Sequence, residues 1–119
     1  MRLDPNDAAY LWDMREAARE AMDFIQGVAY QQFVTDRRLR LAVERALEII
    51  GEAARRVSNA FQQAHPELPW RQIIGQRNVL AHNYGDIDPG MVWAVVTQRL
   101  PELVRQLDAL IPPIVDTET

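Results

Sequence analysis

The sequence predicts an all-α protein, and three observations carry that prediction. Apolar residues recur every three or four positions along most of the chain, which is the period of an amphipathic helix. Alternating apolar and polar runs, typical of half-buried strands, are nearly absent, and glycine is scarce, with 5 in 119 residues. The most economical architecture is an up-and-down bundle of four helices, or five if Pro101 divides the last one.

The first helix is expected to start near Pro5 and to run to about Gln26. Its apolar positions follow helical spacing and consist of Ala8, Leu11, Trp12, Ala18, Met22 and Ile25. Gly27 suits the end of this helix, because glycine takes the left-handed conformation of a helix cap at little cost. The helix therefore covers most of the first quarter of the chain.

The second helix is the clearest in the sequence. Residues 28–35 are expected to be a connector anchored by Tyr30 and Phe33, and Asp36 can cap the helix that follows. The apolar stripe consists of Leu39, Val43, Ala46, Leu47, Ile50, Ala54, Val57 and Phe61. Opposite charges stand four residues apart on the solvent face in two pairs, Arg40 with Glu44 and Glu52 with Arg56. Each pair stabilises the helix by only about 0.2–0.5 kcal/mol. The apolar stripe is therefore the main evidence for this helix.

Two further helices are predicted in the second half of the chain. His65-Pro66 breaks the helical pattern, and Pro69 suits the first position of a third helix. The inner face of that helix holds Trp70, Ile73, Ile74, Arg77, Leu80 and Ala81, and the helix should end around residues 83–85. Asp88-Pro89 then resembles a cap followed by a new helix start.

Proline shapes the last helix. Its stripe consists of Val92, Val95, Val96, Leu100, Leu103, Val104, Leu107 and Leu110. Pro101 interrupts this stripe, so we expect a kink or two abutting helices there. Pro112-Pro113 ends it, which gives one domain over residues 1–113 and an expected disordered tail over residues 114–119.

The composition excludes several classes of function. All 13 basic residues are arginine and there is no cysteine, so lysine Schiff-base chemistry, lysine phosphate loops and disulfide-rich modules are excluded. The net charge of −4 argues against a protein that coats nucleic acid, but it leaves room for a local phosphate site. No apolar run approaches the roughly 20 residues of a membrane span, and the first residues lack a signal-peptide core. The expected location is the cytoplasm, with no membrane contact.

One segment concentrates groups that can carry chemistry. Arg77, Asn78, His82 and Tyr84 lie within eight residues of one another at the end of the third predicted helix. At about 100° per residue, Asn78 and His82 share a helix face, whereas Arg77 and His82 are roughly 140° apart. Arg77 and His82 can therefore reach one phosphate, but their spacing does not require it. Two copies of the helix facing one cleft would make this convergence easier.

This group suits RNA cleavage without a metal ion. Histidine takes and gives protons near neutral pH, arginine forks onto phosphate, and RNA supplies its own nucleophile, the 2′-hydroxyl. One histidine cannot easily be base and acid at once, so two histidines related by dimer symmetry would divide the roles. The plain alternative is that Arg77 and His82 cap the helix end and interact with its dipole.

Other polar residues have structural interpretations beside the functional ones. His65, next to Pro66, is expected to be an exposed loop residue. Tyr84 by itself suggests a surface anchor, and Asp86 and Asp88 suggest turn and cap residues, since a metal site would need more ligands nearby. The arginine cluster of Arg37, Arg38 and Arg40 fits an RNA-facing patch or a solvated helix face equally well.

The segment from Arg77 to Tyr84 resembles the R-x4-H-x-Y signature of HepT-like toxins, which belong to the HEPN superfamily. The resemblance extends over nearly the whole chain, through the segments 33–38, 50–54, 65–70 and 84–88. It implies a homodimeric all-α bundle that acts as a metal-independent ribonuclease, with Arg77 and His82 as the catalytic pair. It also implies neutralisation by a minimal, MntA-like nucleotidyltransferase antitoxin, which uses ATP to place AMP on Tyr84. Asn78 matches a polar motif position that contacts phosphate or the partner.

The resemblance implies that the chain needs no cofactor of its own and that its partners are RNA, a second copy and the antitoxin. The alternative function is a non-catalytic HEPN subunit that binds a nucleotidyltransferase and its substrate. A third possibility is a structural helical dimer in which the signature residues only cap helices. The sequence leaves open which RNA is cut and the stoichiometry with the partner.

Overall fold

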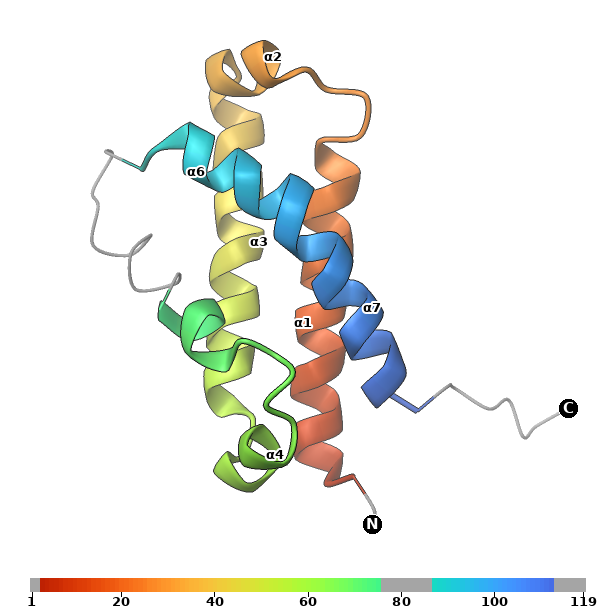
Figure 1. Ribbon diagram of the computed structural model, residues 1–119. Helices are drawn as coiled ribbons and strands as arrows, with labels where there is room; N and C mark the ends of the chain where they lie inside the picture. The colour runs from red at the N-terminus through yellow and green to blue at the C-terminus, as the bar shows by residue number, and fades with distance from the viewer. Residues whose placement is uncertain (1–2, 76–86, 113–119) are drawn as a thin grey trace, which may run out of the picture.

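The computed structural model describes residues 3–75 and 87–112, and helices are the regular secondary structure of these ranges (Figure 1). The predicted all-α class is confirmed. The elements in chain order are α1 (Pro5–Phe24), α2 (Tyr30–Thr35), α3 (Arg37–Arg56), α4 (Asn59–Ala64), a helical segment over residues 70–75, α6 (Pro89–Ala94), the π-helical turn η1 (Val95–Arg99) and α7 (Leu100–Leu110).

Two long antiparallel helices, α1 and α3, form the body of the molecule (Figure 1). The continuous run of α6, η1 and α7 crosses them diagonally, while α2 and α4 lie at opposite ends of the pair. The antiparallel pair agrees with the predicted up-and-down order, while most of the third predicted helix, with its expected end around residues 83–85, lies outside the described residues. None of the described helices is long and apolar enough to cross a membrane.

The core lies where α1, α3 and α7 meet. Its fully buried side chains include Leu11 and Met14 of α1, Val43 of α3 and Leu107 of α7. Burial of each such side chain contributes roughly 1.5–3 kcal/mol, so the apolar stripes hold the bundle together. Trp12, placed on the buried stripe by the sequence, is 44% exposed; the prediction was wrong there, because the buried face of α1 continues through Met14 and Ala17 instead.

A buried carboxylate explains why the second predicted helix is divided. That helix was expected to reach Phe61, but α3 ends at Arg56 and a separate helix, α4, begins at Asn59. Asp7, only 5% exposed, accepts hydrogen bonds from the Ser58 backbone N–H at 2.8 Å and from the Ser58 hydroxyl at 2.6 Å. The same hydroxyl oxygen accepts from the Phe61 N–H at 3.2 Å and caps α4. The first turn of α1 thereby fixes the corner between α3 and α4.

The predicted connector over residues 28–35 contains the short helix α2. Its Phe33 is fully buried and packs against Trp93 of α6, with ring centroids 5.3 Å apart. Gly27 has a φ of +76° in the turn before it, so the left-handed conformation expected at this glycine is confirmed. α1 itself ends at Phe24, two residues before the predicted position.

Pro101 is preceded by a π-helical turn. Proline has no N–H, so it cannot donate to the carbonyl four residues earlier as an α-helix requires. In η1 the Leu100 N–H donates to the Val95 carbonyl, five residues back. The predicted kink or helix boundary thus takes the form of a widened turn. α7 ends at Leu110 as expected, whereas the predicted tail lies outside the described residues.

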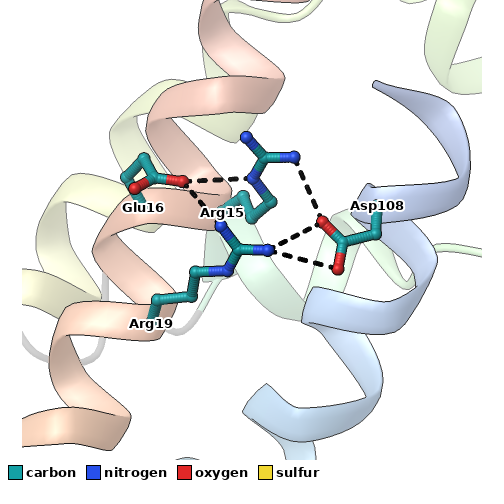
Figure 2. A network of polar contacts seen from close by, with 4 residues as sticks. All are labelled: Arg15, Glu16, Arg19 and Asp108. Atoms are coloured by element: carbon teal, nitrogen blue, oxygen red, sulfur yellow. Dashed lines mark hydrogen bonds and ion pairs between the residues drawn. The ribbon is translucent and has the colours of Figure 1, made fainter. Parts of the chain in front are cut away.

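A network of ion pairs joins α1 to α7 (Figure 2). The Arg15 Nη1 and the Arg19 Nη2 each lie 3.1 Å from Oδ1 of Asp108. Glu16 Oε2 accepts from the other side of both guanidinium groups, at 3.1 Å and 3.2 Å. Two cations and two anions therefore close the edge between these helices.

Candidate active site

The signature residues lie between two described attachment points. Arg77, Asn78, His82 and Tyr84 belong to the stretch 76–86, which is outside the described residues, so their geometry stays a prediction. The helical segment 70–75 leads into this stretch, and Ile87 follows it directly before α6. The structure therefore describes the surroundings of the candidate site through the residues that pack around these two attachment points.

The leading attachment point is anchored by an aromatic cluster. Trp70 is 7% exposed, and its indole Nε1 donates to the His65 carbonyl at 2.8 Å. Its ring meets Phe61 edge-on, with centroids 6.2 Å apart. The helical segment begins at Trp70, one residue after the proline that was expected to start it. Burial of the indole with its N–H paired holds the start of this segment firmly in place.

His65 is half-buried, so the prediction of an exposed loop histidine was wrong. Its Nδ1 lies 3.0 Å from Glu67 Oε2, and its ring stacks on Phe61 with centroids 4.3 Å apart. The pKa of Glu67 lies below its ordinary value, because the residue's own backbone N–H donates to the carboxylate and His65 adds a further hydrogen bond. The loop after α4 is thus held by specific contacts.

The trailing attachment point is a capped helix start. The Asp88 carboxylate accepts from the Gly90 N–H at 2.8 Å, which confirms the predicted cap of α6. Ile87 packs against the core. Asp86, the other candidate turn residue, lies outside the described residues. The chain therefore leaves and rejoins the bundle at two well-packed positions.

A pocket of about 400 Å³ opens beside the leading attachment point. Its walls come from α3, from the loop and helical segment around residues 67–73, and from η1 and α7. The lining consists of Leu47, Ile50, Glu67, Pro69, Gln72, Ile73, Val95, Gln98, Arg99, Leu100, Glu102, Leu103 and Gln106. The apolar members from α3, η1 and α7 are buried core residues, whereas most of the polar ones are exposed. The pocket thus has an apolar floor and a polar rim.

The polar rim contains both engaged and free groups. Gln106 Nε2 donates to the Glu67 carbonyl at 3.1 Å, and the Glu102 carboxylate accepts from Arg105. Gln72, Gln98 and Arg99 make no side-chain hydrogen bond or ion pair within the described part of the chain. Sequence reasoning missed this pocket, because its lining comes from three separate segments. The available signal was Pro101, which disturbs the helix at the rim.

The arginine cluster near the start of α3 is divided by the fold. The Arg40 guanidinium donates to the Val34 carbonyl at the end of α2, so it helps to hold the α2–α3 corner. Arg37 and Arg38 are exposed. The structure therefore favours neither interpretation for the cluster as a whole, but it assigns Arg40 a structural contact.

Metal ligands do not gather on the described surface. Among residues 3–75 and 87–112, no three His, Asp or Glu side chains form a group that could hold a metal ion. The contact between His65 and Glu67 supplies two such groups, fewer than the usual three or four ligands.

Family comparison identifies the class of protein. Residues 14–110 match the family described as "Ribonuclease HepT-like", a range that runs from the middle of α1 to the end of α7 and includes the whole signature stretch. The all-helical fold agrees with that class. The chain belongs to the HepT-like ribonuclease family.

Curated relatives carry ribonuclease names. The chain is 37% identical to one from Methanocaldococcus jannaschii over 84% of its own length and 92% of the relative. It is also 37% identical to a relative from Thermococcus cleftensis, over 85% of the chain and 92% of that protein. A "tRNA nuclease HepT" from Aphanizomenon flos-aquae is 28% identical over 84% of the chain and 81% of that relative. No solved structure matches the chain.

Proposed function

We propose that the protein is the toxin of a toxin–antitoxin pair and cleaves RNA without a metal ion. The observation that carries the proposal is membership of the HepT-like ribonuclease family together with an uninterrupted signature, Arg77 to Tyr84, in the sequence. Arg77 and His82 are the catalytic pair, and Asn78 assists in contacting phosphate or the partner. The protein acts in the cytoplasm as a homodimer, so that two signatures line one cleft.

The chemistry follows from these two side chains. A histidine removes the proton from the 2′-hydroxyl, whose oxygen attacks the adjacent phosphorus. The bond to the 5′-oxygen breaks, and a protonated histidine gives that oxygen a proton. Arg77 stabilises the negative charge that develops on the phosphoryl oxygens. Two copies of His82 in one dimer allow one to act as base and the other as acid.

Tyr84 is the proposed control point. A minimal nucleotidyltransferase antitoxin transfers AMP from ATP to the tyrosine oxygen, and pyrophosphate leaves. The added group is bulky and anionic and stands two residues from His82. It would repel the RNA backbone and occupy the cleft, since like charges in a partly desolvated site oppose binding.

The cleavage proposal is tested with matched arginine variants. Purified protein should cut single-stranded RNA in the presence of a chelator, and Arg77→Gln should lower the rate about 10²–10³-fold, as removal of a group that stabilises the transition state does. Arg71→Gln is the control, because Arg71 is exposed on the helical segment that precedes the signature. RNA left intact by the wild type would overturn the proposal and favour the non-catalytic alternative.

The AMP proposal is tested by intact mass. Protein made with the nucleotidyltransferase and ATP should gain the mass of AMP, and Tyr84→Phe should abolish the gain. Tyr30→Phe is the control, because Tyr30 is a partly exposed tyrosine in α2. An equal gain in the Tyr84→Phe variant would show that the acceptor lies elsewhere.

A further inference from the structure

The pocket between α3, residues 67–73 and η1–α7 has the dimensions of a small-ligand site. Its volume of about 400 Å³ falls in the range of roughly 300–1,000 Å³ that is typical of such sites. The floor includes Leu47, Val95 and Leu103, all less than 10% exposed. A flat aromatic ring can cover this floor while its edge faces the polar rim. Unpaired bases of single-stranded RNA offer that combination of apolar faces and polar edges.

Three glutamines supply amide groups at the rim, each from a different element. Gln72 comes from the helical segment, Gln98 from η1 and Gln106 from α7. A side-chain amide presents a donor and an acceptor side by side, as the edges of the bases do. The bond from Gln106 Nε2 to the Glu67 carbonyl fixes that amide, which leaves its Oε1 available as an acceptor. The rim can therefore read a base edge by hydrogen bonds.

The rim offers a cation, Arg99, to an anionic neighbour. Both acidic side chains there already have partners, since Glu67 contacts His65 and Glu102 contacts Arg105. Arg99 is exposed and unpaired within the described residues. A guanidinium forms strong paired hydrogen bonds with phosphate. The pocket thus joins a site for a base to a cation for the adjoining phosphate.

The backbone is distorted at this rim. Gln98 and Arg99 are the last two residues of the π-helical turn that precedes Pro101. π-Helical turns widen the helix and occur frequently at functional sites. Both side chains line the pocket.

Chain connectivity places the pocket near Arg77, the first residue of the signature. Ile73 lines the pocket, and Arg77 follows it by four residues in the sequence. Four trans peptide links span at most about 15 Å between Cα atoms. We propose that the pocket binds one base of the RNA strand close to the cleaved phosphate, with Arg99 on a neighbouring phosphate. This proposal rests on the RNA cleavage proposed above and extends it to base recognition.

Cleavage of oligonucleotides that differ in one base at each position around the cut tests this assignment. Gln98→Leu should reduce the ratio of kcat/KM between the best and worst bases about tenfold, which corresponds to one lost specific contact. Arg99→Gln should raise KM and leave the base preference unchanged. The controls are Gln31→Leu in α2 and Arg45→Gln in α3, which are exposed and line no part of this pocket. An unchanged preference in Gln98→Leu would overturn the assignment.

Binding of the four ribonucleoside 5′-monophosphates separates this proposal from the catalytic one. Added to His82→Gln protein, they should shift the NMR methyl signals of Ile73, Leu100 and Leu103, and the additional Gln98→Leu change should weaken that shift. Shifts at these methyls without any RNA cleavage by the wild type would support the pocket and overturn the ribonuclease proposal. Cleavage by the wild type without shifts at these methyls would leave the ribonuclease proposal standing and overturn the pocket.

Discussion

The two flanks of α7 differ in how their polar side chains are used. On the flank toward α1, Asp108 binds Arg15 and Arg19, and both arginines also contact Glu16 (Figure 2). On the opposite flank of the buried face, residues such as Leu103 and Gln106 line the pocket. The preceding turn η1 continues this open flank with Gln98 and Arg99, which have no partner in the described ranges.

The difference shows how one helix can be held firmly on one side and present exposed polar side chains on the other. At about 100° per residue, Asp108 and Gln106 project from opposite sides of the line through Leu107. The ion pairs on the flank toward α1, the closed flank, and the buried core together hold α7 against α1. The opposite, open flank can therefore carry polar side chains without a partner in the described ranges, and α7 stays in place. A site that recognises a ligand needs polar groups that are held in a fixed position and can bond to the ligand.

The largest expected effect comes from removing the core contact that both flanks share. Leu107 is fully buried, so Leu107→Ala should lower the free energy of unfolding by about 2–5 kcal/mol. Urea denaturation followed by circular dichroism measures it. Leu110→Ala, at a partly buried position on the same helix, should cost clearly less. Equal losses in the two variants would contradict the placement of the core.

A smaller effect is expected on the closed flank. Asp108→Asn removes the shared partner of Arg15 and Arg19. The Asp108 and Arg19 side chains are exposed, at 43% and 45%, whereas Arg15 is 14% exposed. The loss of stability should therefore be at most about 1 kcal/mol, and it should shrink in 1 M salt, where the Debye length falls to about 3 Å. Thermal melts at two salt concentrations measure it. If Asp108→Asn also changed the base preference of RNA cleavage, the result would contradict the proposed difference between the two flanks.

The smallest effect concerns Glu67 at the edge of the open flank. Hydrogen bonds from its own N–H and from His65 hold the pKa of Glu67 below the ordinary value of 4.5. The unfolded chain therefore binds the proton more tightly, so this contribution to stability is present above about pH 4.5 and is lost as the pH falls through the folded pKa. Glu67→Gln should flatten the acid limb of the stability curve measured by urea denaturation. Glu20→Gln, at an exposed position of α1, should retain the acid limb of the stability curve. The same flattening in both variants would refute the assignment of this limb to Glu67.

The long helices were predictable from the sequence, and so were the turn at Gly27 and the cap at Asp88, whereas the corner between α3 and α4 was not. The stripes of α1, α3 and α7 are local patterns, and their burial follows from periodicity. The break between α3 and α4 depends on Asp7, which lies 51 residues before Ser58. Apolar periodicity continued through that break to Phe61, and the local signal for a new helix, the capping residue Ser58, was missed. His65 was likewise misplaced, because Phe61 and Glu67 cover it only once the loop is folded.

The candidate site shows the same division. The signature from Arg77 to Tyr84 is a contiguous motif, which the sequence alone made visible and the family comparison supports at the level of the family. The roles of its individual residues remain predictions. The pocket could not be predicted, because Gln72 and Gln98 stand 26 positions apart in the sequence and meet only through the crossing of η1 and α7 over the bundle.

The two histidines provide the most direct test of the central claim, that the signature is the catalytic centre of a ribonuclease. The measurement is the initial rate of RNA cleavage in a chelator by His82→Gln and by His65→Gln, each relative to the wild type. We predict that His82→Gln loses about 10²–10⁴-fold in rate, as expected for removal of an acid–base group. His65→Gln removes a loop contact with Glu67 and a ring contact with Phe61, and it should stay near the wild-type rate. Equal rates in the two variants would contradict the account.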